Sequence, residues 1–174
     1  MLTMTNLKTF FVCIGVAFLL SGNVQANSAE ELFDLGYEAF MKRDYAGAER
    51  YWKRAGTLDH VRAQNGLGIM YRDGDLGEPR AEDAAIWFTK SANNGYAFAM
   101  FNLGMLYKNG EISQSSDIVG YRWLLLANII NFDENAKFQA NLLSQRMDQK
   151  SIMIAREQAQ LWVDDFFYGV LSEK

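Results

Sequence analysis

Side chains suited to acid–base chemistry or to binding a metal are sparse in this sequence. His60 is its one histidine, so a catalytic triad or a histidine metal cluster would have to form without a second imidazole. It lies in a short turn-like segment, which favours a solvated turn residue over a catalytic base. The sequence has no GxSxG, SxxK or HExxH pattern and no phosphate-binding glycine loop. We therefore predict no catalytic residue, no metal ligand and no cofactor.

The acidic stretch DGDLGE, residues 73–78, offers a second kind of chemistry. Asp73, Asp75 and Glu78 could supply carboxylate oxygens to Ca²⁺, but a calcium loop also needs a fifth-position ligand and a terminal glutamate, which are missing here. We expect a polar turn. The same carboxylates leave an enzymatic alternative open, because an envelope hydrolase would need a pair such as Asp73 and Glu78 in one cleft.

Two cations, Arg72 and Lys108, stand 36 residues apart, inside the similar stretches LGIMYRDG and LGMLYKNG. The wider pattern recurs at the same step. Five residues recur 36 positions later: Ala63, Leu67, Gly68, Tyr71 and Gly74 correspond to Ala99, Leu103, Gly104, Tyr107 and Gly110. The same spacing of 36 separates three large aromatic residues, Tyr51, Trp87 and Trp123. Two helices per period are typical of an α-solenoid, in which each hairpin buries its apolar face against the next.

Apolar residues recur every three or four positions, and short runs rich in glycine, asparagine and aspartate separate them. This spacing predicts helices joined by tight loops. The expected helices lie near 29–42, 45–57, 61–72, 80–93, 97–108, 117–130, 134–147 and 149–171.

Length and composition indicate one domain. A chain of 174 residues with 49% hydrophobic residues can bury a single core. Its net charge of −4 gives no phosphate-tracking surface, so we expect no nucleic-acid partner.

The amino-terminal segment has the layout of a bacterial secretory signal. Lys8 precedes an apolar run from Phe10 to Leu20, and small residues follow, up to Ala26. The run is shorter than the ~20 residues of a membrane-spanning helix. We predict a signal peptide over 1–26, cleavage after Ala26, and a periplasmic or secreted protein without a stable membrane span; an uncleaved anchor is the alternative. Cys13, the one cysteine, lies inside this run.

The repeated residues resemble the Sel1-like repeat family, a 36-residue relative of the tetratricopeptide repeat. The second unit is most similar to it, through Leu67, Gly68, Tyr71, Trp87 and Gly95. In the first unit, Leu35 and Gly36 instead fit tetratricopeptide spacing. The resemblance implies an all-α fold: an α-solenoid of antiparallel helix hairpins in one domain, 27–174. We expect repeats at about 29–60, 61–96 and 97–131, followed by capping helices over 132–172.

The residues expected to pack the repeats together are apolar or small and lie on one stripe of each helix. They are Leu35, Gly36, Leu67, Gly68, Tyr71, Trp87, Leu103, Gly104, Tyr107 and Trp123.

The resemblance to tetratricopeptide arrays implies a groove lined by the first helix of each unit. By register, its lining would be Phe33, Tyr37, Phe40, Asn65, Ile69, Arg72, Phe101, Met105 and Lys108. Arg72 and Lys108 would then be neighbouring cations, able to hold an acidic or carboxy-terminal segment of a partner protein. Alternatively, the aromatic residues are core and the cations are solvated.

The last predicted helix has a wide apolar face that includes Ile152, Trp162 and Phe166. We expect it to cap the solenoid. If the cover is incomplete, the run Phe166-Phe167-Tyr168 would be exposed and could support a homo-oligomer or bind a partner.

These observations favour an exported, non-enzymatic adaptor that binds a partner protein or peptide. The family resemblance implies a role in the assembly or regulation of an envelope complex. Two alternatives remain open: a cell-envelope hydrolase acting on peptidoglycan or β-lactam-like substrates, and a structural subunit of a motor or secretion apparatus.

Overall fold

The computed structural model describes residues 28–131 and 133–169. Over these ranges the chain forms eight α-helices and one short π-helix, and it contains no strand. The helices are α2 (Ala29–Met41), α3 (Tyr45–Gly56), α4 (Val61–Asp73), α5 (Ala81–Asn93), α6 (Ala97–Asn109), α7 (Asp117–Asn131), α8 (Glu134–Ser144) and α9 (Gln149–Asp164), followed by the π-helix η1 (Asp165–Gly169).

Local signals explain where the helices begin and end. Ser28 and Glu31 form a reciprocal capping box at the start of α2. The Asp44 and Asp148 carboxylates accept backbone N–H groups at the starts of α3 and α9. Gly74 and the residue 36 positions later, Gly110, end α4 and α6 in the left-handed conformation, which glycine adopts without steric cost.

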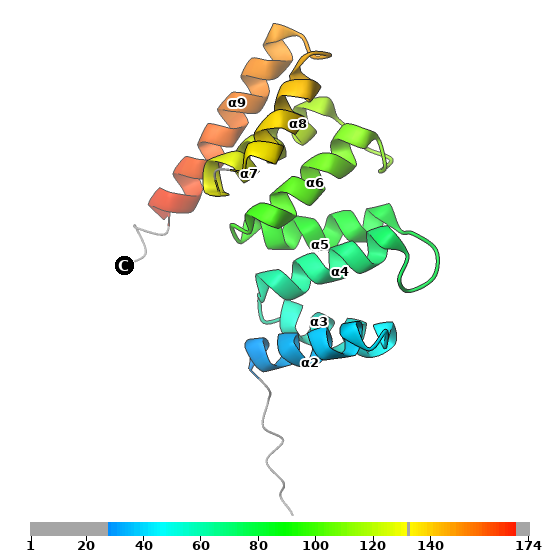
Figure 1. Cartoon of the computed structure of the whole chain (residues 1–174). Coiled ribbons are helices and arrows are strands. Elements are labelled where there is room, and N and C mark those ends of the chain that lie inside the picture. The colour runs from blue at the N-terminus through cyan, green and yellow to red at the C-terminus, as the bar shows by residue number, and fades with distance from the viewer. Residues whose placement is uncertain (1–27, 132, 170–174) are drawn as a thin grey trace, which may run out of the picture.

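The helices form hairpins that stack along the chain. Helices α2 and α3, α4 and α5, and α6 and α7 pack as pairs, and α3 contacts α4 as α5 contacts α6. Figure 1 shows the three pairs following one another from the blue to the yellow-green part of the ribbon. The prediction of an all-α solenoid of helix hairpins is confirmed.

The carboxy-terminal helices cover the last hairpin. Both α8 and α9 pack on α7. One core cluster extends from Leu32 in α2 to Ala159 in α9, and a second joins residues of α7, α8 and α9, including Tyr121, Leu143 and Ile152. The π-helix η1, which follows α9, reaches the turn between α5 and α6, where the Phe166 ring lies against Gly95.

Each hairpin closes over a glycine. A Cβ at Gly36 would lie 2.3 Å from the Trp52 ring, one at Gly68 would lie 2.4 Å from the Phe88 ring, and one at Gly104 would lie 2.8 Å from Leu124. No side chain could occupy these positions without displacing the partner helix. The three covering residues, Trp52, Phe88 and Leu124, are themselves 36 residues apart.

The residues that cover the glycines on the second helices, Phe88 and Leu124, lie one position after the expected packing residues Trp87 and Trp123. Both tryptophans also pack within the array. Trp123 is buried, but Trp87 is only half-buried, and it packs against Gly56 of the preceding hairpin. Of the other packing residues, Leu35 and Tyr107 are half-buried, and the rest are buried: Gly36, Leu67, Gly68, Tyr71, Leu103 and Gly104.

Helix boundaries differ most at the carboxy-terminal end. The helix expected over 134–147 ends at Ser144, and the one expected over 149–171 ends at Asp164, where the π-helix takes over. The predicted signal peptide, 1–26, lies outside the described residues. No described helix is both long and apolar enough to cross a membrane.

Candidate interaction surface

The first helices of the three hairpins are linked side by side through their side chains. We call the solvent-accessible side of α2, α4 and α6 the first-helix face. At its amino-terminal end, Phe33 is half-buried, and its ring stacks on Trp52 and on His60, with centroids 6.2 Å and 4.7 Å apart. The Arg62 guanidinium lies 4.3 Å from the centroid of the Phe33 ring. Tyr37, one turn further, is 52% exposed.

His60 has a structural role in this arrangement. Its Nδ1 accepts the backbone N–H of Ala63 and caps α4, and its Nε2 lies 2.9 Å from a carboxylate oxygen of Glu30. Hydrogen bonds from His60 and Arg62 hold the pKa of the Glu30 carboxyl below its ordinary value. The side chain is only 10% exposed, so the expectation of a solvated turn residue was wrong.

A chain of polar contacts joins α4 to α6. Asn65 is buried and accepts a 3.0 Å hydrogen bond from the Asn102 amide, whose oxygen accepts a 3.1 Å bond from Arg72. Arg72 also donates two bonds to the Asp73 carboxylate. Its guanidinium is therefore already occupied within the chain, and it offers less to a partner than the sequence suggested. Ile69 is half-buried and packs against the core.

In the third hairpin, the expected groove residues are partly covered. Phe101 and Met105 pack against the cluster that α7, α8 and α9 build. At Lys108 it is the backbone carbonyl that is engaged, by the Arg146 guanidinium, which also pairs with Asp117. In the first hairpin, the expected groove residue Phe40 packs on Tyr45 and Trp52. The continuous groove expected from the sequence is thus reduced to the side chains of α2 and α4 and to Lys108 on α6.

The acidic turn shows no sign of a cation site. Asp73 pairs with Arg72, and the described residues include no group of three histidine, cysteine, aspartate or glutamate side chains that could hold a metal ion. Asp73 and Glu78 do not line the cleft described next.

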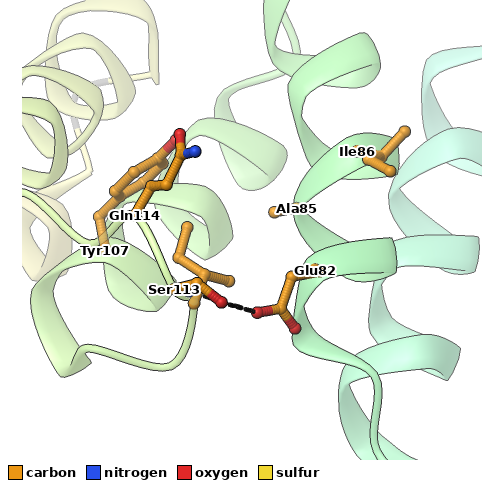
Figure 2. A pocket seen from close by; sticks show the side chains of 7 residues that line it. Glu82, Ala85, Ile86, Tyr107, Ser113 and Gln114 are labelled. Carbon is orange, nitrogen blue, oxygen red and sulfur yellow. Dashed lines mark hydrogen bonds between the residues drawn. The ribbon is translucent and has the colours of Figure 1, made fainter.

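A cleft of about 370 Å³ lies between α5 and the end of α6. Figure 2 shows Tyr107 and Gln114 on one wall and Glu82, Ala85 and Ile86 on the facing helix. Ser113 donates a 2.7 Å hydrogen bond to Glu82 across the mouth. This bond, with one from the Ser113 backbone, holds the pKa of Glu82 below its ordinary value. Sequence reasoning missed this cleft.

The equivalent space one hairpin earlier, between α3 and α4, is filled by side chains. The Tyr71 hydroxyl donates a 2.5 Å hydrogen bond to Glu49, Lys53 pairs with the same carboxylate at 2.7 Å, and the Arg80 guanidinium lies 4.3 Å from the ring centroid. Burial acts to raise the pKa of Glu49, but the bonds from Lys53 and Tyr71 outweigh it, so the pKa is lowered. The 36-residue step was the signal that could have revealed both gaps.

A family model described as the Sel1 repeat matches residues 25–60, 61–96 and 97–128. These three matches cover most of the chain and coincide with the three stacked hairpins. The chain belongs to the Sel1 repeat family. The third family match ends inside α7, so α8 and α9 lie beyond the matched repeats.

Other Sel1 repeat proteins are similar to this chain in sequence or in fold. A sel1-like repeat-containing protein of Acanthamoeba polyphaga mimivirus is 47% identical over 49 residues, which are 28% of this chain and 9% of that protein. The solved structure of c5321, a protective antigen of uropathogenic Escherichia coli strains with an SLR fold, has a TM-score of 0.75 at 20% identity, covering 80% of this chain and 31% of that one. A Sel1 repeat protein from Oxalobacter formigenes has a TM-score of 0.61 at 19% identity, covering 86% and 68%. These structures support the fold. The chain spans a small part of the first two relatives.

Proposed function

We propose that this Sel1 repeat protein is a non-enzymatic scaffold that binds a partner protein through the surface of its stacked hairpins. The observation that carries the proposal is the first-helix face. There, the exposed Tyr37 ring and the Lys108 side chain lie on helices that are held in place by buried packing and, between α4 and α6, by the hydrogen bonds joining Asn65, Asn102 and Arg72. Aromatic and cationic side chains on rigid elements are what protein-binding surfaces use most.

We further propose that the protein acts outside the cytoplasm. The support is the sequence of residues 1–26, which has the layout of a cleavable secretory signal. The mature chain would begin at Asn27. Mass spectrometry of the protein from the periplasm or the medium of expressing bacterial cells tests this, because it measures the amino terminus directly. Retention of the whole leader in membranes would contradict cleavage.

An affinity-capture experiment tests the scaffold proposal. The bait is the chain after export, incubated with a bacterial envelope extract, and the variant combines Tyr37→Ser with Lys108→Glu on the first-helix face. Lys150→Glu, which reverses an exposed charge on α9, is the matched control. We expect a partner retained by the wild type and the control and lost by the double variant. Equal retention by all three would contradict the assignment of this face, and no retention by any would contradict the scaffold proposal.

A further inference from the structure

Because the hairpins repeat, the space between α3 and α4 can be compared with the equivalent space between α5 and α6. In the first gap, between α3 and α4, the space beside Tyr71 is occupied by Glu49 and Lys53. Thirty-six residues later, in the gap between α5 and α6, Tyr107 takes the place of Tyr71, while Ala85 and Thr89 take the places of Glu49 and Lys53. Ala85 lines both the cleft and an adjoining hollow, and Thr89 lines that hollow. We infer that this space is the volume that a glutamate and a lysine fill one hairpin earlier.

The loss of these two side chains also removes a hydrogen-bond partner. Glu49 accepts the Tyr71 hydroxyl, whereas the Tyr107 hydroxyl has no partner within the described residues. Arg80, whose guanidinium covers the Tyr71 ring, is replaced at the same step by Ser116. The cleft thus presents a tyrosine without the acceptor and the cation that its counterpart has.

The charges around the cleft favour an anion. Lys90 and Thr89 line the adjoining hollow of about 390 Å³, which shares Ala85, Ile86 and Tyr107 with the cleft. Arg122, on α7, is partly buried with its Nε unpaired, and it is close enough to Tyr107 for the two to interact electrostatically. The carboxylate of Glu82 is already engaged by Ser113 at the other end. A carboxylate entering beside Thr89 would therefore meet the hydroxyls of Thr89 and Tyr107. Lys90, whose ammonium lies 4.4 Å from the centroid of the Trp87 ring, adds positive charge to the same hollow.

We propose that this cleft binds an aspartate or glutamate side chain on a segment of a partner protein, with its carboxylate accepting the Tyr107 hydroxyl as Glu49 accepts that of Tyr71. The apolar wall of Ala85 and Ile86 contacts the methylene groups of that side chain. The inference rests on the proposed function, because it assumes that the chain binds a protein. It adds a second contact, separate from the first-helix face, and specifies its chemistry.

The test uses two matched peptides, acetyl-Gly-Gly-Glu-Gly-Gly-amide and its glutamine counterpart, titrated into the whole chain. Binding is read from NMR shifts of the Ile86 and Ile112 methyl groups, which line the cleft. We expect the glutamate peptide to bind about tenfold more tightly than the glutamine peptide, since a charge-assisted hydrogen bond is lost in the latter. Equal shifts from both peptides, or none from either, would overturn the proposal.

Two variants locate the binding. Ala85→Glu combined with Thr89→Lys rebuilds in this gap the pair that fills the first one, so the protein should fold and no longer bind the glutamate peptide. Tyr107→Phe removes only the hydroxyl and should weaken binding about tenfold while leaving stability unchanged. Undiminished binding by Tyr107→Phe, or by a folded double variant, would overturn the assignment.

The Ala85→Glu, Thr89→Lys double variant also distinguishes failure of this inference from failure of the proposed function. In the affinity-capture experiment, a partner that the double variant loses, and that free glutamate peptide but not glutamine peptide displaces from the wild type, supports the cleft. A partner held equally by the wild type and the double variant overturns the cleft while the scaffold proposal stands. No partner held by either overturns both.

Discussion

At the scale of single residues, the fold depends on large side chains that cover glycines. Phe88 is fully buried against Gly68, and Trp52 and Leu124 occupy the same place over Gly36 and Gly104. Sequence patterns reveal such a glycine easily, because it recurs with its neighbours. They do not say which of two adjacent bulky residues covers it, because a one-residue step turns a helix by about 100° and both residues stay near the core.

Gly68→Ala tests this packing. Alanine in a helix interior normally stabilises by about 0.5–1 kcal/mol relative to glycine, but here the new Cβ would lie 2.4 Å from the Phe88 ring. We therefore expect the free energy of unfolding, measured with urea, to fall by about 1–3 kcal/mol. The exposed Asn141→Ala on α8 is the control and should change little. Equal or greater stability of Gly68→Ala would contradict the packing described.

The two repeated tyrosines make a matched pair. Tyr71→Phe removes a hydrogen bond to a carboxylate, and we expect a loss of about 1 kcal/mol in the free energy of unfolding, since Glu49 keeps Lys53 as a partner. Tyr107→Phe removes a hydroxyl with no partner in the described part of the chain, so we expect a change within about 0.5 kcal/mol. Equal losses in the two variants would show that the gaps are alike.

At the scale of elements, the carboxy-terminal helices show what sequence periodicity can and cannot provide. The apolar face of α9 predicted a capping helix, and α9 does pack on α7. Its end does not remain a regular helix, because Asp165–Gly169 widens into a π-helix that places Phe166 against Gly95. This contact joins residues far apart in the chain, which no local pattern encodes.

Phe166→Ala tests the docking of this end. The ring stacks on Trp162 with centroids 4.7 Å apart and lies on Gly95. Its removal should lower the free energy of unfolding by about 1–2 kcal/mol and increase hydrogen exchange in α9. Phe167, which is 49% exposed, provides the control: Phe167→Ala should cost less than about 0.5 kcal/mol. The reverse order of the two variants would contradict this account of the helix end.

The start of α9 should respond to acid. Hydrogen bonds to Asp148 from the backbone and hydroxyl of Ser151 hold its pKa below the ordinary value. Because the folded pKa is the lower one, this stabilisation is complete above the unfolded pKa of about 3.9 and is lost as the pH falls through the folded pKa. We expect the first turn of α9 to lose amide protection in that range.

Asp148→Asn is the control for this prediction, because asparagine also caps helices but does not titrate. Its first-turn protection, corrected for the intrinsic exchange rate, should not change with pH over the same range. An identical acid response in the wild type and in Asp148→Asn would mean that another group is responsible.

At the scale of the whole molecule, the periodic sequence was sufficient to predict the solenoid, because every hairpin repeats the same buried surface. The candidate surface was harder to predict. The repeat register placed Arg72, Phe101 and Met105 on the first-helix face. In the structure, however, Arg72 donates hydrogen bonds to Asp73 and Asn102, and the core cluster of α7, α8 and α9 partly covers Phe101 and Met105. Such partners come from outside the repeat pattern. The cleft at Tyr107 follows from differences between repeats, which a search for similarity overlooks.

The central claim is that these stacked hairpins bind a protein, and hydrogen-exchange mass spectrometry of the captured complex tests it most directly. The account predicts increased protection on binding in α2, α4 and α6 and at the cleft between α5 and α6, with α8 unchanged as the internal reference. Capture of no partner from the envelope extract, or a complex in which protection rises only in α8 and α9, would contradict the account.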